Sequence, residues 1–249
     1  MSLRALLSGL ALALLTPQIA GAVDCARMTF KDNRYTACTV APETENLALY
    51  LNDGNGQPLG SFETVQLTQR ALGRRLVFAM NAGMYHEDRS PVGYYVENGQ
   101  QQMRVVPNAG PGNFGLLPNG ILCIKDRRAN VIETRAFLAS KPDCKFATQS
   151  GPMLVIDGAL HPRFLPDSTS RYIRNGVGTS EDGKRAVFVI SDNAVTFYEF
   201  AEFFRDTLGT PNALFLDGNV SRMYAPDLSR VDSGRRMGPI VGVTVPSSQ

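Results

Sequence analysis

The chain has few of the residues and motifs on which the commonest hydrolases and kinases depend. It has 2 histidines among its 249 residues. It contains no Gly-x-Ser-x-Gly nucleophile elbow, no phosphate-binding loop ending in Gly-Lys-Ser/Thr and no His-Glu-x-x-His zinc motif. Its 4 cysteines do not have the Cys-x-x-Cys spacing of common zinc sites. These absences argue against the usual serine hydrolase, P-loop kinase and zinc protease classes.

Runs of one charge are also missing. Lys and Arg total 25 and Asp and Glu total 23, which gives a formal net charge of +2. No basic run is interleaved with aromatic residues, as it is in many nucleic-acid-binding proteins. We therefore do not expect nucleic acid as a partner.

Long apolar runs are confined to the N-terminus. Arg4 precedes the apolar run 5–15, and the small residues Ala-Gly-Ala follow at 20–22. This pattern predicts a secretory signal peptide over residues 1–22. No later segment approaches the roughly 20 apolar residues of a membrane helix. We therefore expect a single mature domain over residues 23–249, periplasmic or secreted, peripheral to the envelope and without a membrane span.

The four cysteines form two pairs that are each close in sequence. Four cysteines allow three connectivities, and sequence alone does not choose between them. In an oxidising compartment the simplest pairing is local, so we expect Cys25–Cys38 and Cys123–Cys144 disulfides. Each bridge would contribute about 2–4 kcal/mol to stability.

Short apolar runs separated by Gly, Pro, Asn and Asp predict a strand-rich chain. The expected strands are 35–40, 47–51, 76–80, 93–96, 120–124 and 153–156. The Glu-Asp-Gly sequence at 181–183 stands between two further apolar runs and predicts a β-hairpin.

One helix is strongly indicated. Thr196 and Glu199 form a capping box, apolar residues at helical spacing follow as far as Leu208, and Gly209 ends the pattern. A second helix is expected between Ser61 and Gly73. The helix that follows Thr196 has an expected strand on each side, and this order predicts a βαβ-like unit at 185–217. The expected fold class is α+β, with a strand-rich mixed sheet and a few packed helices.

Polar residues follow the apolar strand 213–216. Gly218 allows a tight turn, and Asp217, Asn219 and Ser221 then present oxygens and an amide at the mouth of the strand. We interpret this segment as the floor of a binding site. The alternative is an ordinary turn, which needs the same residue types.

A second polar cluster follows the strand 76–80. It contains Asn81, Gly83 and the carboxylates Glu87 and Asp88, which are able to transfer a proton. The alternative is a loop with a charged tip.

Two further clusters favour the binding of an anion. Ser150 and Gly151 lie in a turn that can bring backbone amides close to a ligand. Arg171 and Arg174 supply planar guanidinium groups suited to a phosphate, and Asn175 begins a glycine-containing segment that permits close backbone approach.

In this order the four clusters resemble the phosphodiester glycosidase domain family, which includes the mannose-6-phosphate uncovering enzyme. The resemblance extends over roughly residues 45 to 245. Its motifs are Asn81-Ala-Gly-Met-Tyr85, Gly151-Pro-Met-Leu-Val-Ile-Asp-Gly158, Arg174-Asn-Gly-Val-Gly178 and Leu216-Asp-Gly-Asn-Val-Ser221. Ala82 and Asn219 stand where the family pattern has other residues, and the form of the first motif resembles an exported bacterial branch.

The resemblance implies a hydrolase that acts on a sugar-1-phosphodiester in an envelope or extracellular glycan. Arg174, with Arg171 as partner, would hold the phosphate. Asp217 and Asn81 would bind sugar hydroxyls or position water, and Asp88 or Glu87 would act as acid or base. We therefore take Asp217, Asp88 and Glu87 as candidate catalytic residues.

Two alternatives stay open. The departures at Ala82 and Asn219 allow a non-catalytic protein that binds phosphoglycan or carbohydrate on the same scaffold. No cofactor is required by the first hypothesis, but Asp217, Asn219 and a backbone carbonyl could also bind Ca²⁺ in a metal-dependent hydrolase.

Overall fold

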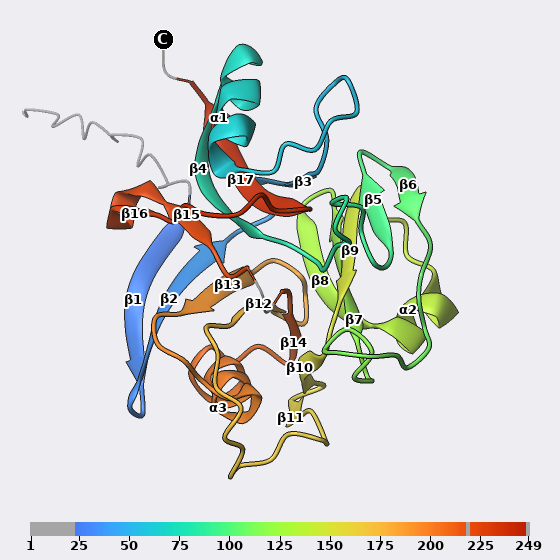
Figure 1. Ribbon diagram of the computed structural model, residues 1–249, viewed down its shortest axis with the longest axis vertical. Helices are drawn as coiled ribbons and strands as arrows, with labels where there is room; N and C mark the ends of the chain where they lie inside the picture. Colours follow the sequence, from blue (N-terminus) through green and yellow to red (C-terminus); the bar gives the residue numbers. More distant parts are fainter. Residues whose placement is uncertain (1–22, 218–219, 248–249) are drawn as a thin grey trace, which may run out of the picture.

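The computed structural model describes residues 23–217 and 220–247. The signal peptide predicted at 1–22 lies outside the described residues. Within them the strands form three sheets, and Figure 1 shows their arrangement. The largest is a seven-stranded sheet. Its strands in spatial order are β1 (Asp24–Phe30), β2 (Asn33–Val40), β13 (Ala186–Ser191), β12 (Asn175–Thr179), β14 (Asn212–Phe215), β10 (Met153–Ile156) and β11 (Ala159–Leu160).

Two five-stranded sheets complete the fold, and we name each after one of its strands. The β4 sheet has the order β16 (Arg230–Val231), β15 (Met223–Ala225), β4 (Arg74–Asn81), β17 (Ile240–Pro246) and β3 (Asn46–Tyr50). The β7 sheet, at the right in Figure 1, has the order β6 (Gln100–Met103), β5 (Tyr95–Glu97), β9 (Phe146–Ser150), β7 (Gly120–Lys125) and β8 (Arg128–Glu133).

The α+β class is confirmed, and the structure corrects one detail of it. Every strand pair among the described residues is antiparallel, so the sheets are not mixed in their hydrogen bonding. The βαβ-like unit at 185–217 nevertheless exists. Strands β13 and β14 both run antiparallel to β12, which lies between them, and are therefore parallel to each other. The predicted hairpin at 181–183 joins β12 to β13.

The helix predicted at 197–208 forms and covers one face of the seven-stranded sheet (Figure 1). It begins as α3 (Phe197–Glu202), where both hydrogen bonds of the predicted capping box are present. It then widens into a π-helix, η1 (Phe203–Thr207). Phe200, Phe203 and Phe204 are all fully buried against the sheet. The wider π-helical turn accompanies this packing, which the helical spacing alone did not reveal.

The other helices are short. The helix predicted between Ser61 and Gly73 is α1 (Phe62–Ala71), which Ser61 caps by accepting a hydrogen bond from Thr64 N. The helix α2 (Thr134–Ser140) and the 3₁₀ turn η2 (Pro226–Leu228) were not predicted, because neither has an extended apolar stripe. No helix in the ranges 23–217 and 220–247 has both the length and the apolar character needed to cross a membrane.

Both predicted disulfides are confirmed. Cys25–Cys38 links the paired strands β1 and β2, and Cys123–Cys144 links β7 to the segment before β9. A shared core joins the sheets: Phe78 of the β4 sheet contacts Phe188 of the seven-stranded sheet with ring centroids 5.2 Å apart. On β13, Phe188 faces this core while Val187 and Val189 face the helix, so the strand is buried on both faces.

Candidate active site

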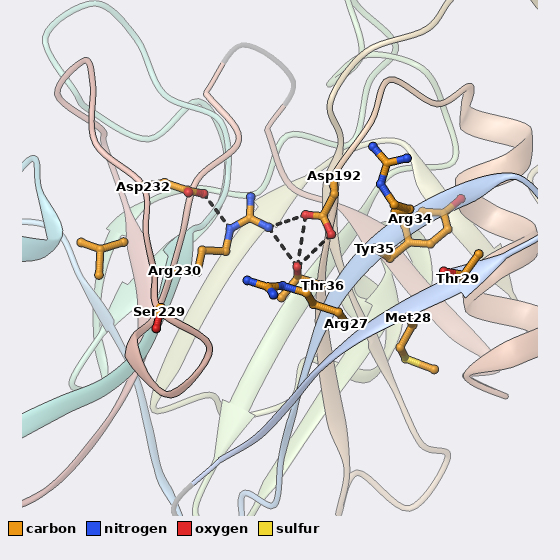
Figure 2. Close-up of a pocket in the computed structure, with 11 residues that line it drawn as sticks. Arg27, Met28, Thr29, Arg34, Tyr35, Thr36, Asp192, Ser229, Arg230 and Asp232 are labelled. Carbon is orange, nitrogen blue, oxygen red and sulfur yellow. Dashed lines mark hydrogen bonds and ion pairs between the residues drawn. The ribbon is translucent and has the colours of Figure 1, made fainter.

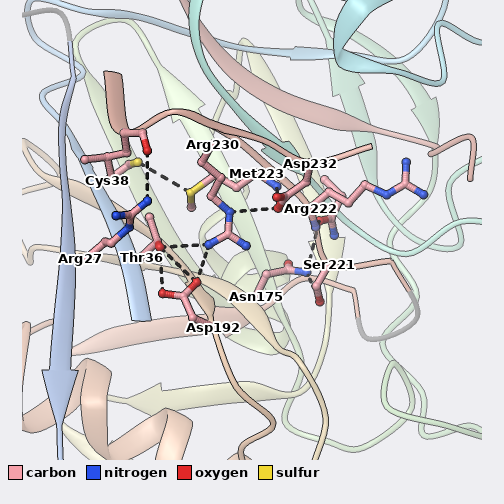
Figure 3. Close-up of polar contacts among 12 residues, drawn as sticks. Arg27, Thr36, Cys38, Asn175, Asp192, Ser221, Arg222, Met223, Arg230 and Asp232 are labelled. Atoms are coloured by element: carbon pink, nitrogen blue, oxygen red, sulfur yellow. Dashed lines mark hydrogen bonds and ion pairs between the residues drawn. The ribbon is translucent and has the colours of Figure 1, made fainter. Parts of the chain in front are cut away.

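Three of the four polar clusters meet at the side chain of Asn175, at the start of β12. Its Nδ2 donates to Asn81 Oδ1 at 3.2 Å, to the Asp217 carbonyl at 2.8 Å and to Ser221 Oγ at 2.9 Å. Figure 3 shows Asn175 beside Ser221. Because Asn175 is fully buried, these bonds form in a low-dielectric setting and fix the ends of β4, β12 and β14 relative to one another.

The remaining cluster, that of Ser150 and Gly151, is joined to the same region through Ser150. Its Oγ donates a hydrogen bond to the carbonyl of Leu216, the residue that precedes Asp217. Ser150 is fully buried and ends β9, so it anchors the β7 sheet to the end of β14. This hydrogen bond gives Ser150 a structural role, in addition to any contact that it makes with a ligand.

Asn81 contributes a buried donor. Its Oδ1 accepts from Asn175 and from the backbone N–H of Arg222 at 2.9 Å, while its Nδ2 has no hydrogen-bond partner in the described part of the chain. Asn81 is fully buried. Unsatisfied buried donors are rare in folded proteins, so this amide is available to a ligand or a water molecule.

Arg174 is a buried cation without a carboxylate partner among residues 23–217 and 220–247. Its side chain is 2% exposed, and its guanidinium carbon lies 3.6 Å from the ring centroid of Phe197. Nε donates to the Val195 carbonyl at 2.9 Å and Nη2 to the Ser170 carbonyl at 3.0 Å. Burial lowers the pKa of Arg174 to about 10, so the group remains charged at neutral pH.

Arg174 and Asp217 line the same cavity, which we call the Arg174 pocket. Its volume is about 410 Å³. The lining residues are Met84, Gly112, Asn113, Ser170, Tyr172, Arg174, Phe197 and Asp217. A buried guanidinium held by aromatic rings, with donors still unused, is suited to bind an anion next to the Asp217 carboxylate.

A second cavity, the Arg235 pocket, also has Asp217 among its lining residues. Its volume is about 480 Å³. The lining residues are Met84, Tyr85, His86, Glu87, Arg89, Val92, Asp217, Val220, Arg235 and Arg236. Burial, and then the nearby Asp217 carboxylate, raises the pKa of Tyr85, so its hydroxyl stays a neutral donor. Met84 and Asp217 belong to both cavities and separate them.

The two candidate carboxylates of the first cluster are in different positions. Glu87 lines the Arg235 pocket together with Asp217. Asp88 is exposed and does not line either cavity; its Oδ1 accepts from Ser90 N at 2.9 Å and from Ser90 Oγ at 2.6 Å. These hydrogen bonds lower the pKa of Asp88, which favours its ionised form. Of the pair, Glu87 is the one that shares a cavity with Asp217.

Arg171 is not beside Arg174 in the pocket. Its Nη2 forms an ion pair with Glu199 Oε1 at 2.7 Å, and its side chain is about half exposed. The two arginines lie three positions apart near the start of β12, and only Arg174 turns inward.

The glycines of these motifs serve packing. A Cβ on Gly83 would lie 2.3 Å from Thr148 Oγ1, and one on Gly151 would lie 2.7 Å from Asn119 Cβ. The glycines after Asn175 are close to the adjacent strand and to the helix: a Cβ on Gly176 would lie 2.7 Å from the Leu214 carbonyl oxygen and 3.3 Å from Phe200 Cε1, and one on Gly178 would lie 2.4 Å from Thr210 Oγ1 and 2.7 Å from Phe204 Cδ1. The last two glycines therefore let α3 and η1 pack on the sheet.

Two residues of the predicted site, Gly218 and Asn219, lie outside the described residues. The predicted Ca²⁺ site includes Asn219 and therefore stays a prediction. No group of three or more His, Cys, Asp or Glu side chains within the described ranges could hold a metal ion.

A third hollow, the Arg230 groove, has a different character. Its volume is about 540 Å³, and Figure 2 shows its lining residues. Arg230 Nε donates to Asp232 Oδ2 at 3.0 Å, and its Nη1 donates to Asp192 Oδ1. Asp192 also accepts from Thr36 Oγ1 (Figure 3). These contacts pair the Arg230 cation with two carboxylates and link β2, the end of β13 and the segment around β16.

Sequence reasoning missed several residues that line the two cavities near Asp217. Phe197 was assigned to the apolar stripe of the helix, although it also stacks on Arg174. Asn113 stands in an irregular segment without a strong motif. Arg235 and Arg236 form a doublet between Gly234 and Gly238, and this doublet was the available signal for a basic loop.

Comparisons with known proteins agree with the geometry. The family profile described as phosphodiester glycosidase (NAGPA) matches residues 74–244. The uncharacterized Escherichia coli K12 protein YigE is 38% identical over 217 residues, which cover 86% of this chain and 83% of YigE.

Two solved structures share the fold at low identity. The catalytic domain of zebrafish N-acetylglucosamine-1-phosphodiester alpha-N-acetylglucosaminidase has a TM-score of 0.58 and 13% identity, covering 89% of this chain and 81% of that one. A hypothetical protein from Synechocystis has a TM-score of 0.60 and 14% identity; the match covers 90% of this chain and spans 62% of the other. Since the family profile matches well over half of its length, this chain belongs to the phosphodiester glycosidase family.

Proposed function

We propose that this protein is an exported hydrolase that cleaves the bond between a sugar and the phosphate of a sugar-1-phosphodiester in an envelope or extracellular glycan. The observation that carries the proposal is the shared cavity of Arg174 and Asp217. The cavity joins a cation for the phosphate to a carboxylate for the reacting carbon. Family membership supports the same reaction class.

Arg174 binds the phosphodiester in this mechanism. It is charged at neutral pH, and it is the buried cation of the pocket. Its stacking on Phe197 and its bonds to two carbonyls fix the plane of the guanidinium before substrate arrives. A preorganised cation stabilises the negative charge that develops on the departing phosphate oxygen.

Asp217 acts at the sugar carbon. Water adds to C1 and loses a proton, the bond from C1 to the phosphate oxygen breaks, and the products are a sugar and a phosphomonoester. Asp217 either accepts the proton from water or stabilises the positive charge on the sugar ring. Because the second pKa of a phosphomonoester is about 6, this leaving group needs little protonation at neutral pH. One well-placed carboxylate can therefore suffice for the reaction. If a second carboxylate takes part, Glu87 is the candidate.

Export is supported by the N-terminal sequence and by the two disulfides, which persist in oxidising compartments. Fractionation of cells that express the full chain would test this part of the proposal.

The reaction is tested with the phenyl phosphodiesters of glucose 1-phosphate and N-acetylglucosamine 1-phosphate. The expected products are free sugar and phenyl phosphate, with oxygen from isotope-labelled water in the sugar. Asp217→Asn and Arg174→Met should strongly reduce turnover while the circular dichroism spectrum is retained. Arg34→Gln is the matched control, because Arg34 is an exposed arginine of the Arg230 groove. Phenol and sugar 1-phosphate as products would refute the proposed bond cleavage.

A non-catalytic phosphoglycan-binding protein is the second candidate. The observation that favours it is that Asp217 is the one carboxylate among the described lining residues of the Arg174 pocket. Binding of the phenyl phosphodiester without turnover, lost in Arg174→Met, would support this candidate. The same assay after exhaustive chelation tests the Ca²⁺ alternative, since activity that survives chelation would count against it.

A further inference from the structure

The Arg235 pocket has a positive wall that the cleavage of a simple sugar phosphodiester does not require. Three guanidinium groups line it, those of Arg89, Arg235 and Arg236. No carboxylate among the described residues lies within ion-pair distance of any of them. Glu87 and Asp217 also line the cavity, so its arginines exceed its carboxylates by one, and a bound anion would balance the remaining positive charge.

The basic loop is fixed against the rest of the pocket. Gly238 packs on the ring of Tyr85 so closely that a Cβ there would lie 2.4 Å from Tyr85 Cγ. Met237 is buried, and its N–H donates to the Gly60 carbonyl at 2.8 Å. Arg236 donates to the Pro58 carbonyl. The residues that make these contacts follow Arg235 directly in the sequence. The Arg235 guanidinium is therefore carried by an anchored backbone.

Arg89 reaches the pocket from an unfavourable backbone conformation. Its φ is 76°, in the left-handed region that glycine adopts without strain and other residues seldom occupy. Its guanidinium lies over the Tyr85 ring and donates to the Glu87 carbonyl at 2.7 Å. An arginine at a position suited to glycine indicates that its side chain contributes something other than backbone stability.

The two pockets meet at Met84 and Asp217. In a sugar-1-phosphodiester the phosphate is attached directly to C1. If Arg174 holds the phosphate and Asp217 acts at C1, the sugar ring extends past Asp217 into the Arg235 pocket. The residues Arg89, Arg235 and Arg236 then line the space that the sugar occupies, and the part of the substrate beyond the phosphate lies away from them.

We propose that the Arg235 pocket binds an anionic group carried by the sugar, so that the substrate is the 1-phosphodiester of an acidic sugar, one bearing a carboxylate or a phosphate. Arg235 and Arg89 contact this group, and Arg236 adds to the positive field. The inference rests on the proposed function for the orientation of the substrate. The binding of an acidic sugar does not depend on turnover.

The kinetic test compares three phenyl phosphodiesters that differ in the sugar: glucose, glucuronic acid and glucose 6-phosphate. The wild-type protein should show a kcat/KM roughly tenfold higher for one or both acidic sugars, about the effect of one charge-assisted hydrogen bond. The glucuronic acid and glucose 6-phosphate arms distinguish a carboxylate from a phosphate. The preference should decrease with added salt, because the pocket is open to solvent.

Two variants locate the preference. Arg235→Gln removes a guanidinium that has no hydrogen bond or ion pair with another described residue, and Arg89→Gly removes one while relieving the backbone strain. Each should lower kcat/KM for the acidic sugars and so bring the acidic and neutral sugars close to equal kcat/KM. Arg34→Gln in the Arg230 groove should leave the preference unchanged. A wild-type preference for glucose, or a preference for acidic sugars that survives both variants, would overturn the inference.

A binding experiment separates this inference from the proposed reaction. Ligand-observed NMR compares glucuronate and glucose 6-phosphate with glucose, using the wild type, Arg235→Gln and Arg174→Met. Acidic sugars should bind more tightly than glucose to the wild type and to Arg174→Met, but not to Arg235→Gln. If no diester is cleaved yet this pattern appears, the reaction fails and the acidic-sugar site stands. If no acidic sugar binds better than glucose, the site fails, whatever the outcome for turnover.

Discussion

The Arg174 pocket and the Arg230 groove are hollows of similar size that combine arginine and aspartate in opposite ways. In the groove the guanidinium of Arg230 bonds to Asp192 and Asp232, so this cation has its partners within the protein. In the pocket Arg174 has carbonyl and aromatic neighbours and faces the cavity with donors that no described residue uses.

The difference shows that the size of a hollow does not identify a binding site. The groove is the larger of the two, about 540 Å³ against about 410 Å³, yet its central arginine is committed to the fold. A group that already has its partner contributes to stability, and a charge held without one is available to a ligand. Substitution of Arg174 should therefore mainly affect activity, and substitution of Arg230 should mainly affect stability.

The largest expected effect is on activity in Arg174→Met. Loss of the cation should reduce kcat/KM for the phenyl phosphodiesters by about 10²–10³-fold, the usual effect of losing one preorganised charge-stabilising group. Stability should fall by no more than about 1 kcal/mol, because the buried charge and its desolvation cost are removed together. Kinetics and urea unfolding measure the two quantities. Retained activity would contradict the assignment of Arg174 as the phosphate-binding group.

The next effect concerns acid stability at the wall behind the Arg174 pocket. His161 stacks on Phe164, which stacks on Phe197, and burial lowers the pKa of His161 to about 4. The unfolded chain binds a proton near pH 6.5 and the folded protein does not, so stability falls as the pH falls from about 6.5 to about 4. At about 1.4 kcal/mol for each pKa unit, the loss is roughly 3 kcal/mol.

His161→Asn should remove this acid sensitivity, since its side-chain oxygen can accept the hydrogen bond from Arg163 N but cannot titrate. Urea unfolding at pH 7 and pH 4 provides the measurement for both proteins. Equal pH dependence in wild type and variant would show that His161 is not the titrating group.

A smaller effect, on stability alone, is expected for Arg230→Met. The variant leaves Asp192 and Asp232 without their cation, and the partly buried hydrogen bonds to charged groups are worth about 1.5–3 kcal/mol. Turnover measured well below the melting temperature should change by less than about twofold. A large loss of kcat in a folded variant would show that the groove takes part in the reaction and would remove the contrast with the Arg174 pocket.

The smallest effect is expected for Arg171→Ala. Arg171 pairs with Glu199 at the surface, and such pairs contribute about 0–1 kcal/mol. Activity should change by less than about threefold, far less than in Arg174→Met. An equal loss of activity in the two variants would restore the paired-arginine phosphate site that the sequence suggested.

Local features of the fold were predictable because they depend on neighbouring residues. The capping box of Thr196 and Glu199, the hairpin at 181–183 and the two disulfides each involve groups close in sequence. The helix α2 and the π-helical end of α3 were not predictable in this way. Their geometry depends on packing against strands that come from distant parts of the chain.

The candidate site was predictable as a set of segments and not as a set of roles. Motif order indicated that Asn81, Ser150, Asn175 and Asp217 belong together, and hydrogen bonds join them. The sequence did not indicate that Asn175 acts as the common hydrogen-bonding centre. It also did not indicate which of two nearby arginines is buried, because that depends on the position of Phe197 in space.

The sequence by itself determined the strand-rich α+β class and the family, since these follow from apolar periodicity and ordered motifs, and it favoured the local disulfides without choosing between the three connectivities. Only the tertiary structure decided which charges are paired and which face a cavity. Arg230 and Arg174 have the same chemistry, and the loop that carries Arg235 lies more than a hundred residues from Arg89 in sequence. The partners of a charge are set by how distant strands and loops pack, and this packing separates a structural ion pair from a binding group.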